Sequence, residues 1–490
     1  MNCSYFYYTN QLVNFYTFSY FTLMIQSHII DLLLFMGVEN MEKKSSLTSG
    51  SPFKVLLLFA LPMVLSVTLQ QLYNICDSLI AGKLIGENAL ASINASYPVT
   101  MIYLAFATGF GVGANIICAK FVGEESDKYI KETIYTALIS VTILAVIIGL
   151  IGFFITNPLL NLLNVDNEIF TDASIYLKYY CIGMLFLFIY NSVTSLFQAL
   201  GNSRIPLYLL LFSTLLNIGL DLAFVKSMKV EGIALATLIS QCVASTISFI
   251  ILIIYTNKKY KEKALLFNKK ILIKILPIAI PSILQASVIS LGQIAIQSLI
   301  NQFSPAAIAG YGAAYKLCYV IVNIYTTMSN AISTYTSQNA GAMKFERIKK
   351  GYHSGLLICI ILTIITTIIF LIIPDKLLSI FTNENASVEV YEVGRKFIYC
   401  VAPFYIVLCM KIPCDGVLKG SGDMTSFMIG TFADLVVRVS LSFILFYTLP
   451  QDQRIIGIFI SWPIGWLVGV IISETSFNFI KRWKKLIGDI

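Results

Sequence analysis

The sequence predicts an all-α polytopic membrane protein, with twelve transmembrane helices arranged as two pseudo-symmetric lobes of six. Three observations predict this fold: an apolar composition, twelve long apolar stretches and an internal repeat. Hydrophobic residues make up 57% of the 490 residues, charged residues make up 12%, and the mean hydropathy is +0.80. A water-soluble globular chain carries roughly 25% charged residues. So few charges cannot cover the water-facing surface of a soluble protein of this length.

Residues 1–40 precede the first apolar stretch that is long enough to span a bilayer. They are rich in Tyr, Phe and Asn and have neither a basic start nor a clean cleavage site, so a signal peptide is not indicated. Their longest apolar run, 29–38, includes Asp31 and is too short to span. We expect an N-terminal extension that is disordered or has no functional role. The alternative is an interfacial anchor, because aromatic residues favour the membrane interface.

The twelve spans follow from Pro52 onward, because a spanning helix needs about 20 largely apolar residues. Helices are expected, since an open sheet edge leaves backbone polar groups unsatisfied in lipid. The predicted spans are 53–82, 88–118, 132–156, 171–199, 205–226, 231–256, 272–300, 306–335, 351–373, 390–418, 424–448 and 453–480.

The distribution of Lys and Arg predicts the orientation. The N-terminal flank, every second loop after it and the C-terminus hold 23 of the 34 basic residues, and the opposite set of loops holds eight. Cytoplasmic loops of membrane proteins carry the excess of basic residues. We therefore expect both termini and the lysine-rich linker in the cytoplasm of a multi-pass protein of the plasma membrane. The net charge of +8 has this explanation, and nucleic acid is not an expected partner.

The second half of the chain repeats the first. LFALPMVLS at 58–66 is echoed by LPIAIPSIL at 276–284, and FQALGNSR at 197–204 is echoed by VLKGSGDM at 417–424. The third match pairs AKFVGEESDKYIKE at 119–132 with SQNAGAMKFERIKK at 337–350. Each half contains six spans, so the halves have the same orientation and enclose a cavity, as in transporters. The predicted organisation is an extension at 1–40, an N-lobe at 41–256, a cytoplasmic linker at 257–274 and a C-lobe at 275–490.

Two carboxylates inside the first-half spans need an explanation, because an Asp at the centre of a membrane helix costs about 2.5 to 3.5 kcal/mol. Asp77 lies in the first span with Tyr73 one turn before it, and Asp221 lies in the fifth span with Asn217 one turn before it. Asn191 and Thr237 are further polar candidates in the fourth and sixth spans. Such a pocket suits a proton, Na⁺ or an organic cation. The alternative is that these groups hydrogen-bond neighbouring helices.

The second half does not duplicate these carboxylates, since Ile296 and Ser440 occupy the equivalent positions. It carries two oppositely charged pairs at i,i+4 spacing instead, Lys411 with Asp415 and Asp434 with Arg438, which favours intrahelical ion pairs. Their role, structural or in a cytoplasmic vestibule, stays open at this point. Lys316 in the eighth span has no obvious partner.

Several chemistries are excluded or disfavoured. Histidine occurs only at 28 and 353, and the ten cysteines include no CxxC pair, so a metal centre is not expected. No GxxxxGK[ST] motif is present to support ATP drive, and no nucleophile–base pair supports an intramembrane enzyme. We expect no cofactor beyond a coupling ion, and no enzymatic activity.

The chain from about 50 to 480 resembles the multidrug and toxic compound extrusion (MATE) transporters. The matching stretches include ALPMVLSVTLQQLYNICDSLIAGKLIGENALAS, YNSVTSLFQALGNSRIPLY, LNIGLDLAFV and VEGIALATLIS in the first half, and VLKGSGDM in the second. The resemblance implies a V-shaped fold of two lobes. It also implies export of cationic, amphipathic compounds in exchange for H⁺ or Na⁺, by a protein that we expect to act as a monomer.

Within the family the chain looks most like the DinF-type branch. That resemblance implies a first-lobe coupling site of Asp77, Asn191, Asn217, Asp221 and Thr237, with substrate bound by Tyr73, Asp77, Asn191 and Asp221. Na⁺, if it is the coupling ion, is expected at Asp77, Asn217, Asp221 and Thr237. The alternative function is a lipid-linked saccharide flippase of related architecture. Its phosphate head group calls for basic residues along the cleft, for which Lys316 and Lys411 are candidates.

Overall fold

The computed structural model describes residues 47–80, 85–163, 165–382 and 386–479, with the side chains of 72–80, 87, 90, 226, 478 and 479 outside the described part. The predicted extension at 1–40 also lies outside it. The helices are α2 (Pro52–Ile80), α3 (Glu87–Gly123), α4 (Asp127–Leu162), α5 (Asn167–Ala199), α6 (Arg204–Lys259), α7 (Lys269–Ile300), α8 (Pro305–Gly341), α9 (Phe345–Ile372), α10 (Pro374–Leu378), α11 (Val388–Val401), α12 (Tyr405–Gly420), α13 (Met424–Thr448) and α14 (Arg454–Phe479).

The predicted fold class is confirmed, because twelve helical segments of the described chain are long and apolar enough to cross a membrane. Local capping explains where several helices begin. Asp166, Asn268, Ser304 and Asp423 each accept a hydrogen bond from a backbone N–H in the first turn of α5, α7, α8 and α13.

Three spans differ in detail from the prediction. The fifth and sixth spans, which share the label α6, follow each other without an intervening loop and are separated by a sharp turn at Lys229 (φ 51°, ψ −128°). The tenth span is broken into α11 and α12 by a 3₁₀ turn over Ala402–Phe404. Pro403 lies in this turn, and a proline cannot donate the N–H that a continuous helix requires.

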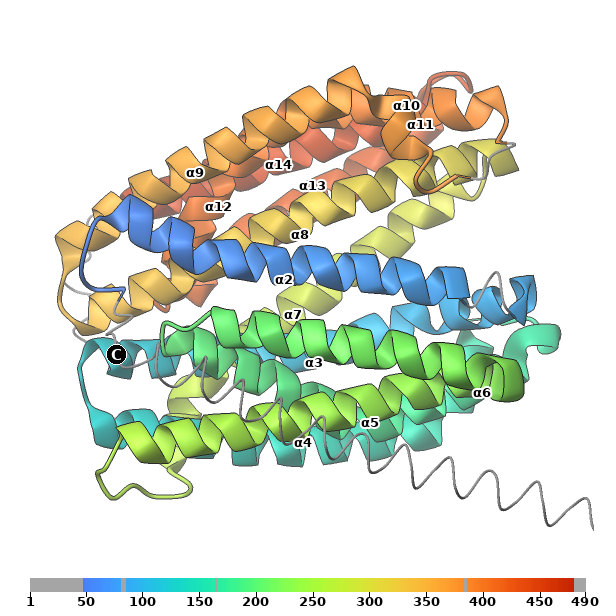
Figure 1. Cartoon of the computed structure of the whole chain (residues 1–490). Helices are drawn as coiled ribbons and strands as arrows, with labels where there is room; N and C mark the ends of the chain where they lie inside the picture. Colours follow the sequence, from blue (N-terminus) through green and yellow to red (C-terminus); the bar gives the residue numbers. More distant parts are fainter. Residues whose placement is uncertain (1–46, 81–84, 164, 383–385, 480–490) are drawn as a thin grey trace, which may run out of the picture.

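The helices form two bundles that lie side by side (Figure 1). One contains α3–α6 and the other contains α8–α14, with α2 and α7 between them. The connections 124–126, 200–203, 260–268, 342–344 and 421–423 share one end of the molecule, which is on the left in Figure 1. We call it the basic end, because the predicted cytoplasmic lysines cluster there.

The first helix of each half crosses into the core of the other bundle. Leu56, Phe59 and Met63 of α2 belong to the hydrophobic core of the second bundle. Conversely, Ile275 and Ala279 of α7 belong to the core of the first bundle. The two bundles are therefore joined by exchanged helices as well as by the linker. The lobe boundaries drawn from the sequence stay a prediction.

Candidate functional site

The kink in α6 makes its two spans an antiparallel hairpin, and this hairpin builds the first polar cluster. Asn217 and Asp221 lie one turn apart before the kink, and Thr237 lies after it. The Asn217 amide donates to the Thr237 hydroxyl at 3.4 Å. Asp221 is 0% exposed and Asn217 is 1% exposed. The structure thus brings together three of the predicted coupling residues.

Asn191 lies on α5, which packs against α6. Its amide nitrogen donates to the Leu187 carbonyl of its own helix at 2.8 Å, and its side chain is half-buried. This bond fixes the amide without joining it to the Asn217–Thr237 pair. Asn191 therefore borders the cluster on a neighbouring helix, and its direct participation stays a prediction.

Asp77 and Tyr73 lie on the last turns of α2, where side chains fall outside the described residues. The helix itself packs against α6, which carries Asn217 and Asp221. Asp77 and Asp221 therefore lie on two neighbouring helices. Contact between their side chains stays a prediction.

Thr237 also lines a small pocket between α5 and the second span of α6. Three tyrosines and an amide accompany it there: Tyr176, Tyr179, Tyr180 and Gln241. The Tyr179 hydroxyl donates to Glu231 at 2.7 Å. The pocket is small, and its lining combines aromatic rings with a few polar groups.

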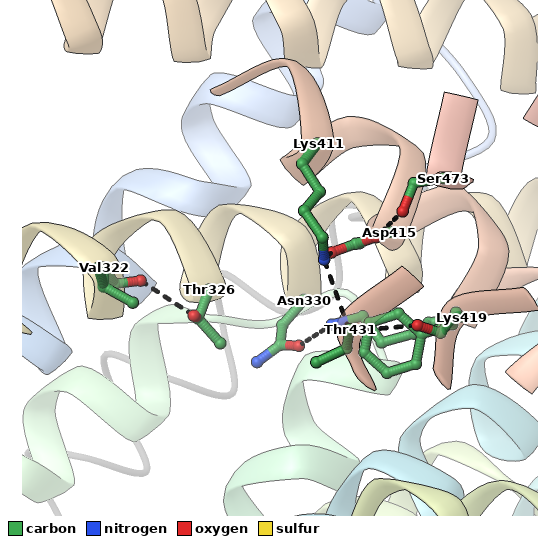
Figure 2. Close-up of polar contacts among 9 residues, drawn as sticks. Val322, Thr326, Asn330, Lys411, Asp415, Lys419, Thr431 and Ser473 are labelled. Atoms are coloured by element: carbon green, nitrogen blue, oxygen red, sulfur yellow. Dashed lines mark hydrogen bonds and ion pairs between the residues drawn. The ribbon is translucent and has the colours of Figure 1, made fainter. Parts of the chain in front are cut away.

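A second polar cluster lies in the other bundle (Figure 2). The Lys411 ammonium is 2.5 Å from the Asp415 carboxylate and 3.5 Å from the Thr431 hydroxyl of α13. Ser473 of α14 donates to the other Asp415 oxygen at 3.0 Å. The predicted intrahelical pair is confirmed, and its partners on α13 and α14 tie three helices together.

The second predicted pair is also confirmed. Asp434 and Arg438 of α13 approach to 3.6 Å, and both are buried. The Arg438 guanidinium lies 4.7 Å from the Trp462 ring centroid on α14, a cation–π distance.

Lys419 is a buried residue that the sequence does not predict, because it follows the tenth apolar stretch and reads as one of the loop lysines. Lys419 lies in the last turn of α12 and is 5% exposed. Its ammonium donates to the Asn330 side-chain oxygen of α8 at 2.8 Å. The available signal was spacing: Lys411, Asp415 and Lys419 follow at i, i+4 and i+8, which places them on one helix face.

The two bundles are in contact at the basic end. Gln338 of α8, which is fully buried, donates to the Ala199 carbonyl of α5 at 2.7 Å. Its side-chain oxygen accepts from the Leu47 N–H at 3.1 Å. One turn before Gln338, the Thr334 hydroxyl donates to Asn115 of α3 at 2.9 Å. These bonds close the basic end of the interface between the bundles.

Comparison with known proteins agrees with the repeat. The family model MatE matches residues 62–223 and 281–444, one copy in each half. The chain is 24% identical to the probable multidrug resistance protein YoeA of Bacillus subtilis over 459 residues, which is 91% of this chain and 96% of that protein. It is 27% identical to the probable multidrug resistance protein YpnP of the same organism over 397 residues, 79% of this chain and 86% of that one.

The fold is also similar to solved structures. The crystal structure of a MATE in complex with MaL6 matches with a TM-score of 0.83 and 21% identity, covering 90% of this chain and 99% of that one.

Proposed function

Because the chain belongs to the MatE family, we propose that it is a secondary active antiporter that exports amphipathic organic cations in exchange for H⁺ or Na⁺. The names of its relatives YoeA and YpnP support multidrug export. The finer assignment to the DinF-like branch is part of this proposal. Transport, not covalent chemistry, is the proposed activity.

The observation that carries the proposal is the buried carboxylate of Asp221, one turn from the Asn217–Thr237 hydrogen bond. A buried carboxylate is costly unless a cation, a proton or a hydrogen bond neutralises it. Amide and hydroxyl oxygens beside it are ligands that Na⁺ accepts. We propose that the coupling ion and the substrate compete for this carboxylate and for Asp77 on α2.

The interface supplies the proposed gate. With the basic end closed by Gln338 and Thr334, exchange takes place from the opposite end. Binding of the ion there displaces the substrate, and the return step opens the basic end. About 2.3 kcal/mol per charge per 100 mV, plus roughly 0.7 kcal/mol for half a pH unit, gives about 3 kcal/mol per proton. For a substrate without net charge, that sustains a concentration ratio on the order of 100. Export of a monovalent cation works against the same membrane potential, so a ratio of that size requires more than one proton per molecule.

The experiment measures ethidium efflux from energised cells that express the full chain, Asp77→Asn or Asp221→Asn. The H⁺ and Na⁺ gradients are collapsed separately. The exposed loop residue Asp452 provides the matched control Asp452→Asn, which removes the same charge away from the site. We expect efflux to depend on one gradient, to be lost in both site variants and to persist in the control.

Efflux that both site variants retain would refute coupling through these aspartates. Absence of efflux by well-expressed wild-type protein under every gradient would instead favour the lipid-linked saccharide flippase. That alternative has a specific observation in its favour, because Lys411 and Lys419 are basic and buried in the second bundle.

A further inference from the structure

The charged residues inside the second bundle do not balance. Lys411 is paired with Asp415, and Arg438 is paired with Asp434. Lys419 is the fifth member of this buried set and forms no ion pair within the described residues. Its hydrogen-bond partner is a neutral amide, Asn330. Among these five buried residues, positive charge therefore exceeds negative charge by one; the nearby half-buried Glu474 carboxylate of α14 accepts a hydrogen bond from the Tyr352 hydroxyl instead.

An excess buried ammonium is expensive. Taking an ion out of water costs several kcal/mol even after relaxation, and a single neutral hydrogen bond returns only part of that. The Phe427 ring, 5.2 Å from the Lys419 nitrogen, contributes a cation–π contact. Neither partner neutralises the charge. Buried lysines are normally paired, so an anion beside Lys419 would lower this cost.

The position of Lys419 indicates where that anion comes from. Its partner Asn330 lies on α8, is only half-buried and is one turn from Thr334. Thr334 reaches across to Asn115 of the first bundle. Lys419 and Asn330 therefore lie beside the interface between the bundles, where a transported molecule passes. The first bundle holds the buried carboxylate of Asp221, so the two bundles carry opposite charges.

We propose that Lys419 and Asn330 form a subsite for the carboxylate or phosphate group of a transported amphiphile. The substrates then include zwitterions, whose cationic part is held by the first bundle and whose anionic part is held by the second. A carboxylate or phosphate oxygen would accept a charge-assisted hydrogen bond from the Lys419 ammonium and a second bond from the Asn330 amide nitrogen. This inference rests on the proposed transport function and deepens it.

The test uses two dyes that share one cationic ring system. Rhodamine 19 carries a free carboxylate, whereas rhodamine 6G is its ethyl ester and lacks that charge. Binding of each dye to the purified full chain in phosphatidylcholine nanodiscs is measured by fluorescence anisotropy. The variants are Lys419→Gln, the charge-retaining Lys419→Arg, and Lys349→Gln, which removes an exposed lysine of the same bundle.

Lys419→Gln should weaken binding of the acid roughly ten- to a hundredfold, because a charged hydrogen bond is lost, and leave binding of the ester nearly unchanged. Retained ester binding also shows that the variant is folded. Lys419→Arg should recover most of the acid binding, and Lys349→Gln should match the wild type. Equal losses for both dyes, or no loss for the acid, would overturn the subsite.

Two further arms separate the remaining outcomes. Nanodiscs with phosphatidylglycerol test whether a lipid phosphate occupies the site, since such a lipid would abolish the Lys419-dependent preference for the acid and overturn the assignment to substrate. Export is then measured in proteoliposomes. Export of the ester but not of the acid would overturn the subsite alone. Export of neither dye would overturn the proposed function, and the subsite with it.

Discussion

Gly123 of α3 and Gly341 of α8 occupy equivalent positions in the repeat, and each lies against the backbone of the helix that carries the other. A Cβ on Gly123 would overlap the carbonyl oxygen of Gln338, and a Cβ on Gly341 would overlap that of Lys120. Lys120 and Gln338 are themselves equivalent in the repeat. The two bundles thus meet at the basic end in a reciprocal contact that only glycine permits.

Replacing either glycine by alanine should open the basic end. The obstructing atoms are backbone, so the helices have to separate, and overpacking of this kind typically costs about 1 to 3 kcal/mol. That shifts an equilibrium between two states roughly 10- to 100-fold. Electron–electron double resonance between spin labels at Lys128 and Glu346 measures the separation. We expect longer distances in Gly123→Ala and Gly341→Ala.

A matched control for these variants is Gly312→Ala. Gly312 is also in the middle of a helix, but a Cβ there meets nothing within 4 Å. Its distance distribution should equal that of the wild type. If Gly341→Ala leaves the distribution unchanged as well, the contact does not hold the basic end closed.

Gln338 should contribute to the same closure through its hydrogen bonds. Gln338→Leu leaves the Ala199 carbonyl and the Leu47 N–H without this partner, and each unsatisfied buried group costs about 1 to 3 kcal/mol. We expect a lower midpoint of thermal unfolding and a longer distance between the labels at Lys128 and Glu346. Gln302→Leu, at an exposed turn, should change neither measurement. A wild-type midpoint in Gln338→Leu would contradict the prediction.

Removing one member of the Lys411–Asp415 ion pair should destabilise the protein more than removing both members. Asp415→Asn leaves the buried Lys411 ammonium without its counter-ion, which typically costs about 3 to 5 kcal/mol. The double variant Lys411→Met, Asp415→Leu removes both charges and should be more stable than Asp415→Asn. The midpoints of thermal unfolding of the purified proteins give the order of stability. The opposite order would show that the ion pair itself stabilises the bundle.

The kink of α6 provides a test of backbone strain. Lys229 has a positive φ of 51°, which disfavours any residue with a Cβ. Lys229→Gly should therefore stabilise the protein by about 1 kcal/mol, whereas Lys229→Ala should not. Differential scanning calorimetry of the two variants measures the midpoint of thermal unfolding. Equal midpoints would mean that the turn at Lys229 is not strained.

The spans of this fold were predictable from the length of the apolar stretches, whereas the helix break at a proline was not. All twelve spans appear because a long apolar helix has few alternatives in lipid. The break at Pro403 was missed, because proline is tolerated in membrane helices and its effect depends on tertiary packing. The ion pairs at 411/415 and 434/438 were predictable from i,i+4 spacing.

The candidate site was less predictable than the fold. The hairpin that joins Asn217 to Thr237 depends on an α6 turn at Lys229, a residue without an obvious turn signature. Lys419 was assigned to a loop because it ends an apolar stretch, yet packing of α8 and α13 buries it. Whether a side chain is buried in a membrane protein depends on the neighbouring helices, and the sequence of one helix does not contain that information.

The crossing of α2 and α7 has a consequence for how such a chain can arise. Either half expressed alone would lack the helix that completes its core, since Phe59 packs in the second bundle and Ile275 in the first. A half-length ancestor with this packing would bury its apolar surface only as an intertwined pair of identical copies. Gene fusion would then have joined two chains that were already interdependent, and later divergence could place an acidic site in one and a basic site in the other.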